Sequence, residues 1–410
     1  MGRVKAYLLL AVSILLAACN GINRPYEGEY ENVLIYCALG YNNLSSNLIQ
    51  NFEDIQEGVL PGISSNCAIV AFCHNTTTYQ NYVDPNPPRL IRILRDSNGR
   101  PVADTLKTYD DITLSPTRDA LRAALSDIAD LFPAKHYGML FSSHGTGWIP
   151  AGYDTKTKPA GLRASGSEPA ATSHVWPETK AVGNQYINSY KNVRWLELSD
   201  FVDAIPVKLD YLILDACLMG TVEVAYGLKD VCRYLVASPA EILTTGMIYK
   251  TLSWDMLSGH EPDLQTYCEE YFEYYNSASG DRRAGTISLV DCEQLEPLAQ
   301  AFKAIIDAHR DGIEGALAGT QRYFYSSSNL RFFYDLQDFA AQLGASDAEL
   351  ARLDDALAGA VLYHAETPAF FDLPLERCCG LSVYIPEASR TRLNDYYTSL
   401  GWNRRTGLVQ

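Results

Sequence analysis

The sequence lacks an excess of basic residues. Of its 410 residues, 33 are Lys or Arg and 49 are Asp or Glu, so the net charge is -16. A broad basic field that could hold nucleic-acid phosphates is therefore absent, and DNA or RNA is not expected as a partner. Cysteine is also scarce, with 10 residues, far below the roughly 8 to 10% that marks a disulfide-built fold. With 47% hydrophobic residues, the chain can instead bury one large core or two ordinary ones.

Two catalytic signatures are missing as well. No His-Glu-x-x-His pair occurs, so a zinc peptidase is unsupported and no metal site is predicted. No Gly-x-Ser-x-Gly elbow is present to support a serine hydrolase. The sequence also shows no internal repeat, so a solenoid or propeller is not indicated.

The N-terminus has the composition of a targeting signal. Arg3 and Lys5 form a short positive region, and Ala6 to Ala17 is a run of mostly apolar residues. This run is too short to span a bilayer and is typical of a secretory signal. We therefore predict a signal peptide over residues 1–18 and a tether over residues 19–30.

The end of this segment, Leu16-Ala17-Ala18-Cys19, resembles the bacterial lipobox, in which the signal is cut before a cysteine that is then acylated. The resemblance implies an exported protein, lipid-anchored through Cys19 with palmitate or a similar acyl chain, at the outer membrane or cell surface. Cleavage would leave 31 basic residues against 49 acidic ones, so the lipid, and not basic charge, would provide the membrane contact. A plain secretion signal with an incidental cysteine is the alternative.

The body of the chain alternates strand-like and helix-like segments. Unbroken apolar runs predict buried strands, and apolar residues at helical spacing predict helices after the first strand, from Ser115-Pro116, and after residue 221. Repeated units of this kind favour an α/β fold with a mostly parallel central sheet and helices on both faces. The expected strands are 33–37, 67–73, 90–94, 137–141 and 211–214.

Two stretches depart from this alternation. Residues 146–194 are rich in Gly, Pro, Ser and Thr without sustained periodicity, which indicates either a functional loop or a plain surface insertion. From about residue 292 the pattern becomes mainly helical, with one further apolar strand over 381–385. We therefore predict a main domain over residues 31–291 and a C-terminal subdomain over residues 292–410.

Chemically interesting residues follow two of the predicted strands. The strand 137–141 runs into His144-Gly145, and the strand 211–214 runs into Asp215-Ala216-Cys217. Ligands of open α/β sheets bind beyond the carboxyl ends of the strands, so these segments are expected to meet. A thiol at a strand-to-helix turn is favoured as thiolate, and a neighbouring imidazole can act as its base. The amides of Gly145 and Cys217 could form an oxyanion hole. Standing alone, a buried cysteine such as Cys217 is most often a small core residue.

Three segments in this order resemble the clostripain family of caspase-like cysteine peptidases. They are His144-Gly145-Thr146-Gly147-Trp148, Asp215-Ala216-Cys217-Leu218-Met219 and Gly380 to Pro386. The resemblance implies a caspase-like αβα sandwich, with residues 31–291 as the catalytic domain. It also implies endopeptidase activity on protein or peptide substrates, with Cys217 as nucleophile and His144 as general base and acid.

Further roles follow only from the same resemblance. Asp215 would line the S1 pocket and favour Arg or Lys at P1, with Glu241 as a nearby second acid. Activation by cleavage in the loop after the histidine is implied, and Arg163 is the preferred site. Calcium is possible by family resemblance, but no recognisable ligand loop is present, so no cofactor is predicted.

Alternatives remain at this stage. The carboxylate of Asp215 could simply hold the loop around Cys217. The protein could be a catalytically inactive caspase-like binding lipoprotein, which retention of both His144 and Cys217 argues against. A surface-binding lipoprotein of another class would leave the two strand ends unexplained. The sequence does not indicate an oligomeric state.

Overall fold

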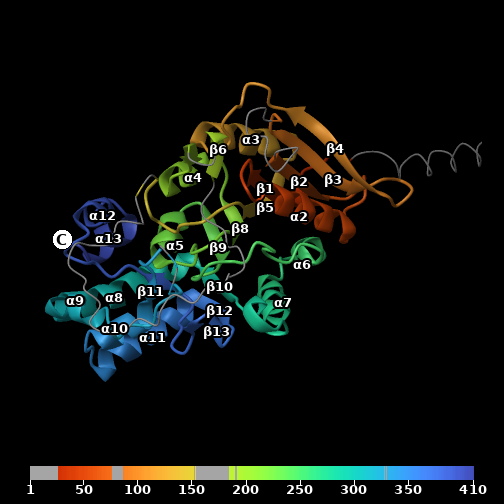
Figure 1. Cartoon of the computed structure of the whole chain (residues 1–410). Coiled ribbons are helices and arrows are strands. Elements are labelled where there is room, and N and C mark those ends of the chain that lie inside the picture. The colour runs from red at the N-terminus through yellow and green to blue at the C-terminus, as the bar shows by residue number, and fades with distance from the viewer. Residues whose placement is uncertain are drawn as a thin grey trace, which may run out of the picture.

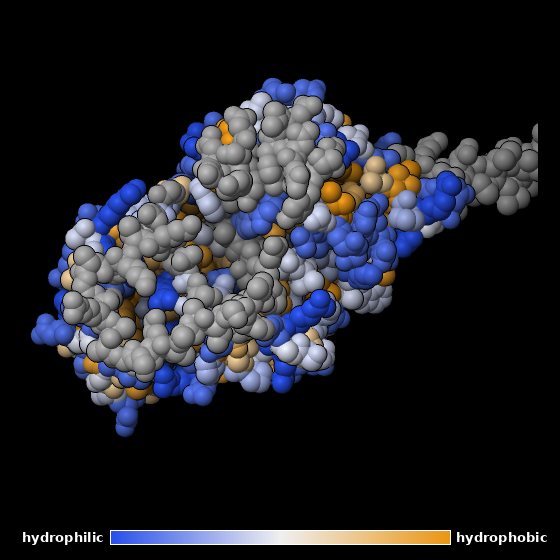
Figure 2. Space-filling view, viewed as in Figure 1, coloured by the Kyte–Doolittle hydropathy of each residue, from blue (hydrophilic) through white to orange (hydrophobic). Residues whose placement is uncertain are grey.

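The computed structural model describes residues 26–75, 86–151, 153, 184–189, 192–326, 328 and 330–410. The predicted signal peptide, Cys19 and Arg163 lie outside these residues. Among the described helices, none is long and apolar enough to cross a membrane. Figure 2 shows hydrophilic side chains spread over much of the visible described surface, with hydrophobic ones in smaller groups.

The core of the molecule is a nine-stranded sheet (Figure 1). Its five central strands are parallel and almost entirely buried, which agrees with their unbroken apolar runs. In spatial order they are β2 (Cys67–Asn75), β1 (Tyr30–Gly40), β5 (Ala134–Ser142), β8 (Leu209–Asp215) and β9 (Cys232–Ala237). The chain proceeds from β1 to β2 on one side and to β5 on the other, so the strand order reverses between β1 and β5. Open α/β sheets bind ligands at such a reversal.

Antiparallel strands flank the parallel centre on both sides. The pair β3 (Arg89–Arg95) and β4 (Pro101–Thr108) continues the sheet beyond β2, and β10 (Thr286–Asp291) with β12 (Val361–Glu366) continues it beyond β9. The predicted strand at 90–94 is therefore present but runs antiparallel to β2. Strand β4 had no prediction because it is a largely exposed edge strand without an apolar run.

Helices cover both faces of the sheet, as predicted (Figure 1). One layer holds α2 (Ser45–Glu57), α6 (Leu252–Leu257) and α7 (Leu264–Asn276). The other layer contains α3 (Arg118–Leu131), α4 (Leu198–Ala204), α5 (Val222–Leu228), α8 (Leu295–His309), α11 (Asp347–Ala360) and α13 (Gly401–Thr406).

One predicted helix start was wrong. The α3 helix begins at Arg118, because the Thr117 hydroxyl accepts the Ala120 amide and caps it. Ser115, the predicted cap, instead contacts the ring of His74, with its Oγ 2.7 Å from His74 Nδ1. The hydroxyl of Ser115 is therefore occupied by a tertiary contact and not by the helix.

The C-terminal part is mainly helical, as predicted, and its remaining helices are α9 (Ile313–Ala316), α10 (Leu336–Gln342) and α12 (Thr391–Tyr397). It also contributes β12 to the central sheet. The predicted strand 381–385 is shorter, since only β15 (Ser382–Val383) is extended, and it pairs with β11 (Tyr334–Asp335) outside the central sheet. The small hairpins are β6 (Asn184–Ser189) with β7 (Asn192–Trp195), at the end of the long loop, and β13 (Ala369–Phe370) with β14 (Leu373–Pro374).

Candidate active site

Cys217 lies in the tight turn between β8 and α5. Its side chain is fully buried, and the Ile242 amide donates to its Sγ at 3.1 Å. The next residue, Leu218, has a φ of 60°, a left-handed conformation that is costly for a branched side chain. The Leu218 amide donates to the Ala240 carbonyl at 2.9 Å. Thr221 then caps α5 by accepting the Val224 amide. Backbone contacts on both sides therefore hold the thiol in a strained, fixed turn.

His144 lies at the end of the neighbouring strand. In the β5–β8 register Ser142 is opposite Asp215, so His144 and Cys217 each follow their strand end by two residues. The imidazole is only 6% exposed, and its Nε2 is 2.6 Å from Oδ1 of Asn43. The sheet thus places the imidazole and the thiol in adjacent turns at one edge.

Gly145 brings these two turns into backbone contact. A Cβ at this position would lie 2.2 Å from the carbonyl oxygen and 2.6 Å from the amide nitrogen of Cys217. Only glycine fits there, because the neighbouring atoms are backbone and cannot move aside. The structure therefore brings together the His-Gly and Asp-Ala-Cys segments that the sequence singled out.

The Asp215 carboxylate is enclosed at the end of β8, with no exposed surface. Its Oδ2 accepts hydrogen bonds from the Ser142 hydroxyl at 2.6 Å and from the Tyr249 hydroxyl. Burial, together with the nearby Asp215 charge, raises the pKa of Tyr249 well above its usual value, so this phenol stays a donor. Asp215 is therefore directly linked to the strand that leads to His144.

Glu241 arrives on the segment after β9. It is 5% exposed, and its carboxylate accepts from the Ser328 hydroxyl at 3.0 Å and from the Tyr325 hydroxyl at 3.4 Å. It directly precedes Ile242, whose amide contacts Cys217. Glu241 thus lies beside the thiol turn, with hydroxyl partners of its own.

The third sequence segment packs beneath the histidine loop. The Trp148 ring, 1% exposed, contacts the rings of Tyr384 and Tyr397 at centroid distances of 5.0 and 4.9 Å. Glu223 on α5 accepts from the Tyr384 amide at 2.9 Å and the Tyr397 hydroxyl at 2.6 Å. All three segments that resemble one family therefore meet in one place.

Sequence reasoning missed three residues of this arrangement: Asn43, Ser142 and Tyr249. Asn43 lies past the first predicted strand, over residues 33–37. Its position beyond a strand end was a usable signal, whereas nothing in the sequence indicated Tyr249. Within the described ranges, His, Cys, Asp and Glu side chains form no group of three that could hold a metal ion.

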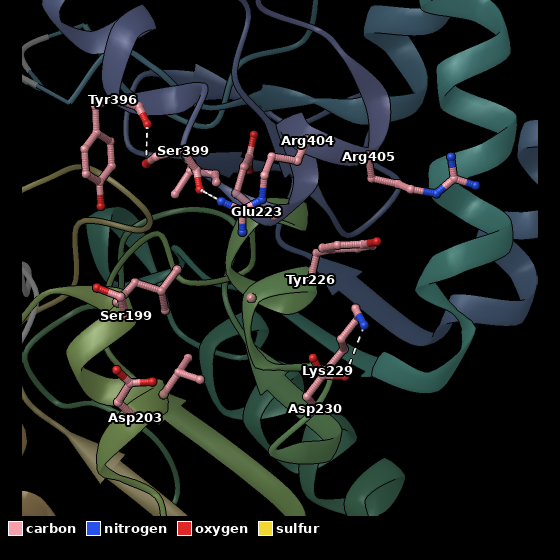
Figure 3. Close-up of a pocket in the computed structure, with 15 residues that line it drawn as sticks. Ser199, Asp203, Glu223, Tyr226, Lys229, Asp230, Tyr396, Ser399, Arg404 and Arg405 are labelled. Atoms are coloured by element: carbon pink, nitrogen blue, oxygen red, sulfur yellow. Dashed lines mark hydrogen bonds and ion pairs between the residues drawn. The ribbon is translucent and has the colours of Figure 1, made fainter.

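A separate cavity of about 600 Å³ lies between α4, α5 and the C-terminal helices (Figure 3). Its lining includes Asp203, Glu223, Tyr226 and Arg404. Neither Cys217 nor His144 lines it. The cavity is therefore not part of the arrangement around the thiol and the imidazole.

Comparison with known proteins decides the family. The model of the clostripain family matches residues 39–331, which span the turn of Asn43, both strand ends and Glu241. The chain belongs to the clostripain family. By that membership it is a cysteine peptidase, so the expected family and the expected class of enzyme are confirmed.

Solved structures agree on the fold. An inactive zymogen C11 protease from Parabacteroides distasonis matches with a TM-score of 0.73 and 24% identity, over 92% of this chain and 99% of that one. A secreted C11 cysteine protease from Bacteroides thetaiotaomicron, called iotapain, matches at 0.71 with 23% identity, over 92% and 100%. A secreted C11 cysteine protease from the same organism, in complex with an irreversible peptide inhibitor, matches at 0.72 with 19% identity, over 92% and 98%. No curated protein matches the chain. The predicted caspase-like α/β architecture is confirmed.

Proposed function

We propose that the protein is an endopeptidase whose catalytic groups are Cys217 and His144. The observation that carries this proposal is the fit of Gly145 against the Cys217 backbone, which fixes the imidazole and thiol turns side by side. His144 takes the thiol proton, and the thiolate attacks the scissile carbonyl carbon. The amides of Gly145 and Cys217 stabilise the resulting oxyanion. His144 then protonates the leaving amine, and water hydrolyses the thioester to release the second product and the thiol.

The direct test is turnover of fluorogenic peptides with Arg, Lys, Asp or Asn at P1, with and without a thiol alkylator. Hydrolysis that the alkylator abolishes supports the proposal. Hydrolysis that survives full alkylation of Cys217 contradicts it.

For specificity, we propose that Asp215 selects Arg or Lys at P1, with Glu241 as a possible second acid. Support comes from the position of Asp215, two residues before the nucleophile in the turn that contacts Gly145. In the structure its Oδ2 accepts two hydroxyl hydrogen bonds. A guanidinium or ammonium that reaches this enclosed carboxylate leaves water, and a carboxylate is the partner that offsets that cost.

We also propose activation by cleavage of the loop after the histidine, at Arg163. A structural neighbour is described as an inactive zymogen, which supports an uncleaved precursor for this fold. Full-length protein should convert into two fragments, the second beginning at Ala164, whereas R163A and C217A should stay intact. Conversion of R163A at an unchanged rate would reject this site.

For localisation, we propose export and attachment through a lipid on Cys19. The short apolar segment before Cys19 supports export, and two of the matching structures are described as those of secreted proteases. C19S should leave the membrane fraction or stay uncut, because the acyl chain is the proposed anchor. Retention of a processed C19S in the membrane fraction would point to another attachment.

A further inference from the structure

We propose that Asn43 is a positioning residue that orients His144 and fixes its tautomer. This inference rests on the proposed function, since it concerns the same imidazole. It starts from one contact, the 2.6 Å separation between Asn43 Oδ1 and His144 Nε2. The two residues are 101 positions apart in the sequence and meet where the strand order of the sheet reverses, between β1 and β5.

The turn that carries Asn43 is itself held in place. Asn42 accepts the Leu44 amide at 2.8 Å and donates to the Leu39 carbonyl at 3.3 Å. The Ser143 hydroxyl donates to the same Leu39 carbonyl at 2.8 Å. The residue before His144 is thus tied to the turn that carries Asn43, so amide and imidazole are positioned by one connected set of bonds.

The chemistry of the contact selects one tautomer. An amide oxygen can only accept a hydrogen bond, so the imidazole nitrogen facing it carries the proton. With Nε2 protonated, the lone pair of neutral His144 is on Nδ1, which is then the atom that accepts the Cys217 proton. The bond to Asn43 exists equally in the imidazolium, so the ring keeps its orientation while a proton is taken up and given away.

The group that accepts the hydrogen bond from His144 is the neutral amide of Asn43 and not a carboxylate. A carboxylate at the same place would stabilise the imidazolium by its charge. An amide orients the ring without that bias, so His144 can still release its proton to the leaving amine. Asn43 would therefore affect the rate of the chemical step and not substrate affinity.

The test compares N43L, which removes the acceptor at similar volume, with N43D, which retains one. We expect N43L to lower kcat by about 10- to 100-fold with KM changed less than about threefold. N43D should recover only part of kcat, because its carboxylate retains the acceptor but also stabilises the imidazolium. In full-length C217A labelled with ¹⁵N at histidine, His144 should show protonated Nε2. Adding N43L should shift that signal toward the other tautomer.

Two results would overturn the inference. Either kcat of N43L stays within twofold of the parent, or kcat falls while the His144 tautomer is unchanged. If N43L does not fold, as judged by its thermal melt, N43A replaces it with the same expectations. The proposed function fails separately, if H144A or C217A retains activity. If H144A and C217A are inactive but N43L is fully active, only the role of Asn43 is rejected.

Discussion

Strand β5 offers a histidine near each of its ends, and the two differ in their surroundings. Near the amino end, His136 Nδ1 is 3.0 Å from Asp210 of β8, and both side chains are more than 40% exposed. Past the carboxyl end, His144 is 6% exposed and contacts the neutral amide of Asn43, while the Asp215 carboxylate of β8 accepts hydroxyl hydrogen bonds. The same two strands thus hold a solvent-screened pair at one end and an enclosed, oriented imidazole at the other. Enclosure and orientation, and not the presence of a histidine beside an acid, distinguish the end that we propose as catalytic.

The largest expected effect comes from substitutions at the enclosed end of the two strands. C217A and H144A should each lower kcat/KM by more than about a thousandfold, because nucleophile and base act as a unit. The matched control H136A should keep kcat/KM within about twofold, since exposed pairs contribute little. The measurement is steady-state hydrolysis of an Arg substrate. Equal losses in H136A and H144A would remove the distinction between the two ends.

A second prediction concerns the backbone contact of the enclosed end. G145A should abolish most activity and lower the free energy of unfolding by about 2 kcal/mol, because the new Cβ overlaps the Cys217 backbone. The control is G62A, where an added Cβ has nothing within 4 Å. Kinetics and urea unfolding measure both effects. A fully active G145A would mean that the two turns are not packed as described.

The third prediction sharpens the role of the enclosed acid. D215N should lower kcat/KM for Arg and Lys substrates, because it leaves a desolvated cation unpaired. The expected loss of transition-state stabilisation is about 2 to 5 kcal/mol. Substrates with an uncharged P1 residue should lose much less. Equal losses for both substrate classes would show that Asp215 holds the loop through Ser142 and Tyr249 and does not select P1.

A fourth prediction uses the pH dependence of stability near the same edge. His74 is buried, stacks on Tyr41 at 4.9 Å, and has its pKa lowered by desolvation to about 4. Between about pH 6.5 and 4 the unfolded chain therefore binds a proton that the folded chain does not, so stability falls as the pH drops. The contribution is on the order of 3 kcal/mol. H74F should lose this part of the pH dependence in urea unfolding, and an unchanged slope would contradict the assignment.

The smallest effect is expected at the exposed end. D210N should change the free energy of unfolding by less than about 1 kcal/mol, because solvent and salt screen its pair with His136. Denaturant unfolding in low and high salt measures it. A loss above about 2 kcal/mol would mean that the exposed pair is structurally important after all.

Local sequence patterns predicted four of the five parallel central strands, but not β9, and they also missed the buried strand β10. The apolar runs in β1, β2, β5 and β8 gave those strands, because parallel central strands contact helices on both faces. The exposed edge strand β4 carries no such pattern, and the direction of β3 depends on pairing. The short β15 strand was overestimated, since its apolar neighbours are buried in the C-terminal part without extending a sheet.

The candidate site likewise contains residues that the sequence could predict and residues that it could not. His144, Gly145 and Cys217 could be found because each follows a recognisable strand. Tyr249 could not, because its contact depends on how a segment 34 residues from Asp215 returns to the same edge. Asn43 also follows a strand, but its partner is 101 residues away, and nothing in the sequence pairs it with His144. Cys19 and Arg163 stay predictions from the sequence.

The central claim is that one thiol, activated at the enclosed end of the sheet, carries the activity. The most direct measurement is covalent labelling of full-length protein with a thiol-directed peptide inhibitor bearing Lys at P1, followed by mass-spectrometric mapping of all ten cysteines. We predict a single adduct on Cys217, lost in H144A and retained in H136A, with activity falling in proportion to labelling. Adducts on another cysteine that track the loss of activity, or full inhibition with Cys217 unmodified, would contradict the account.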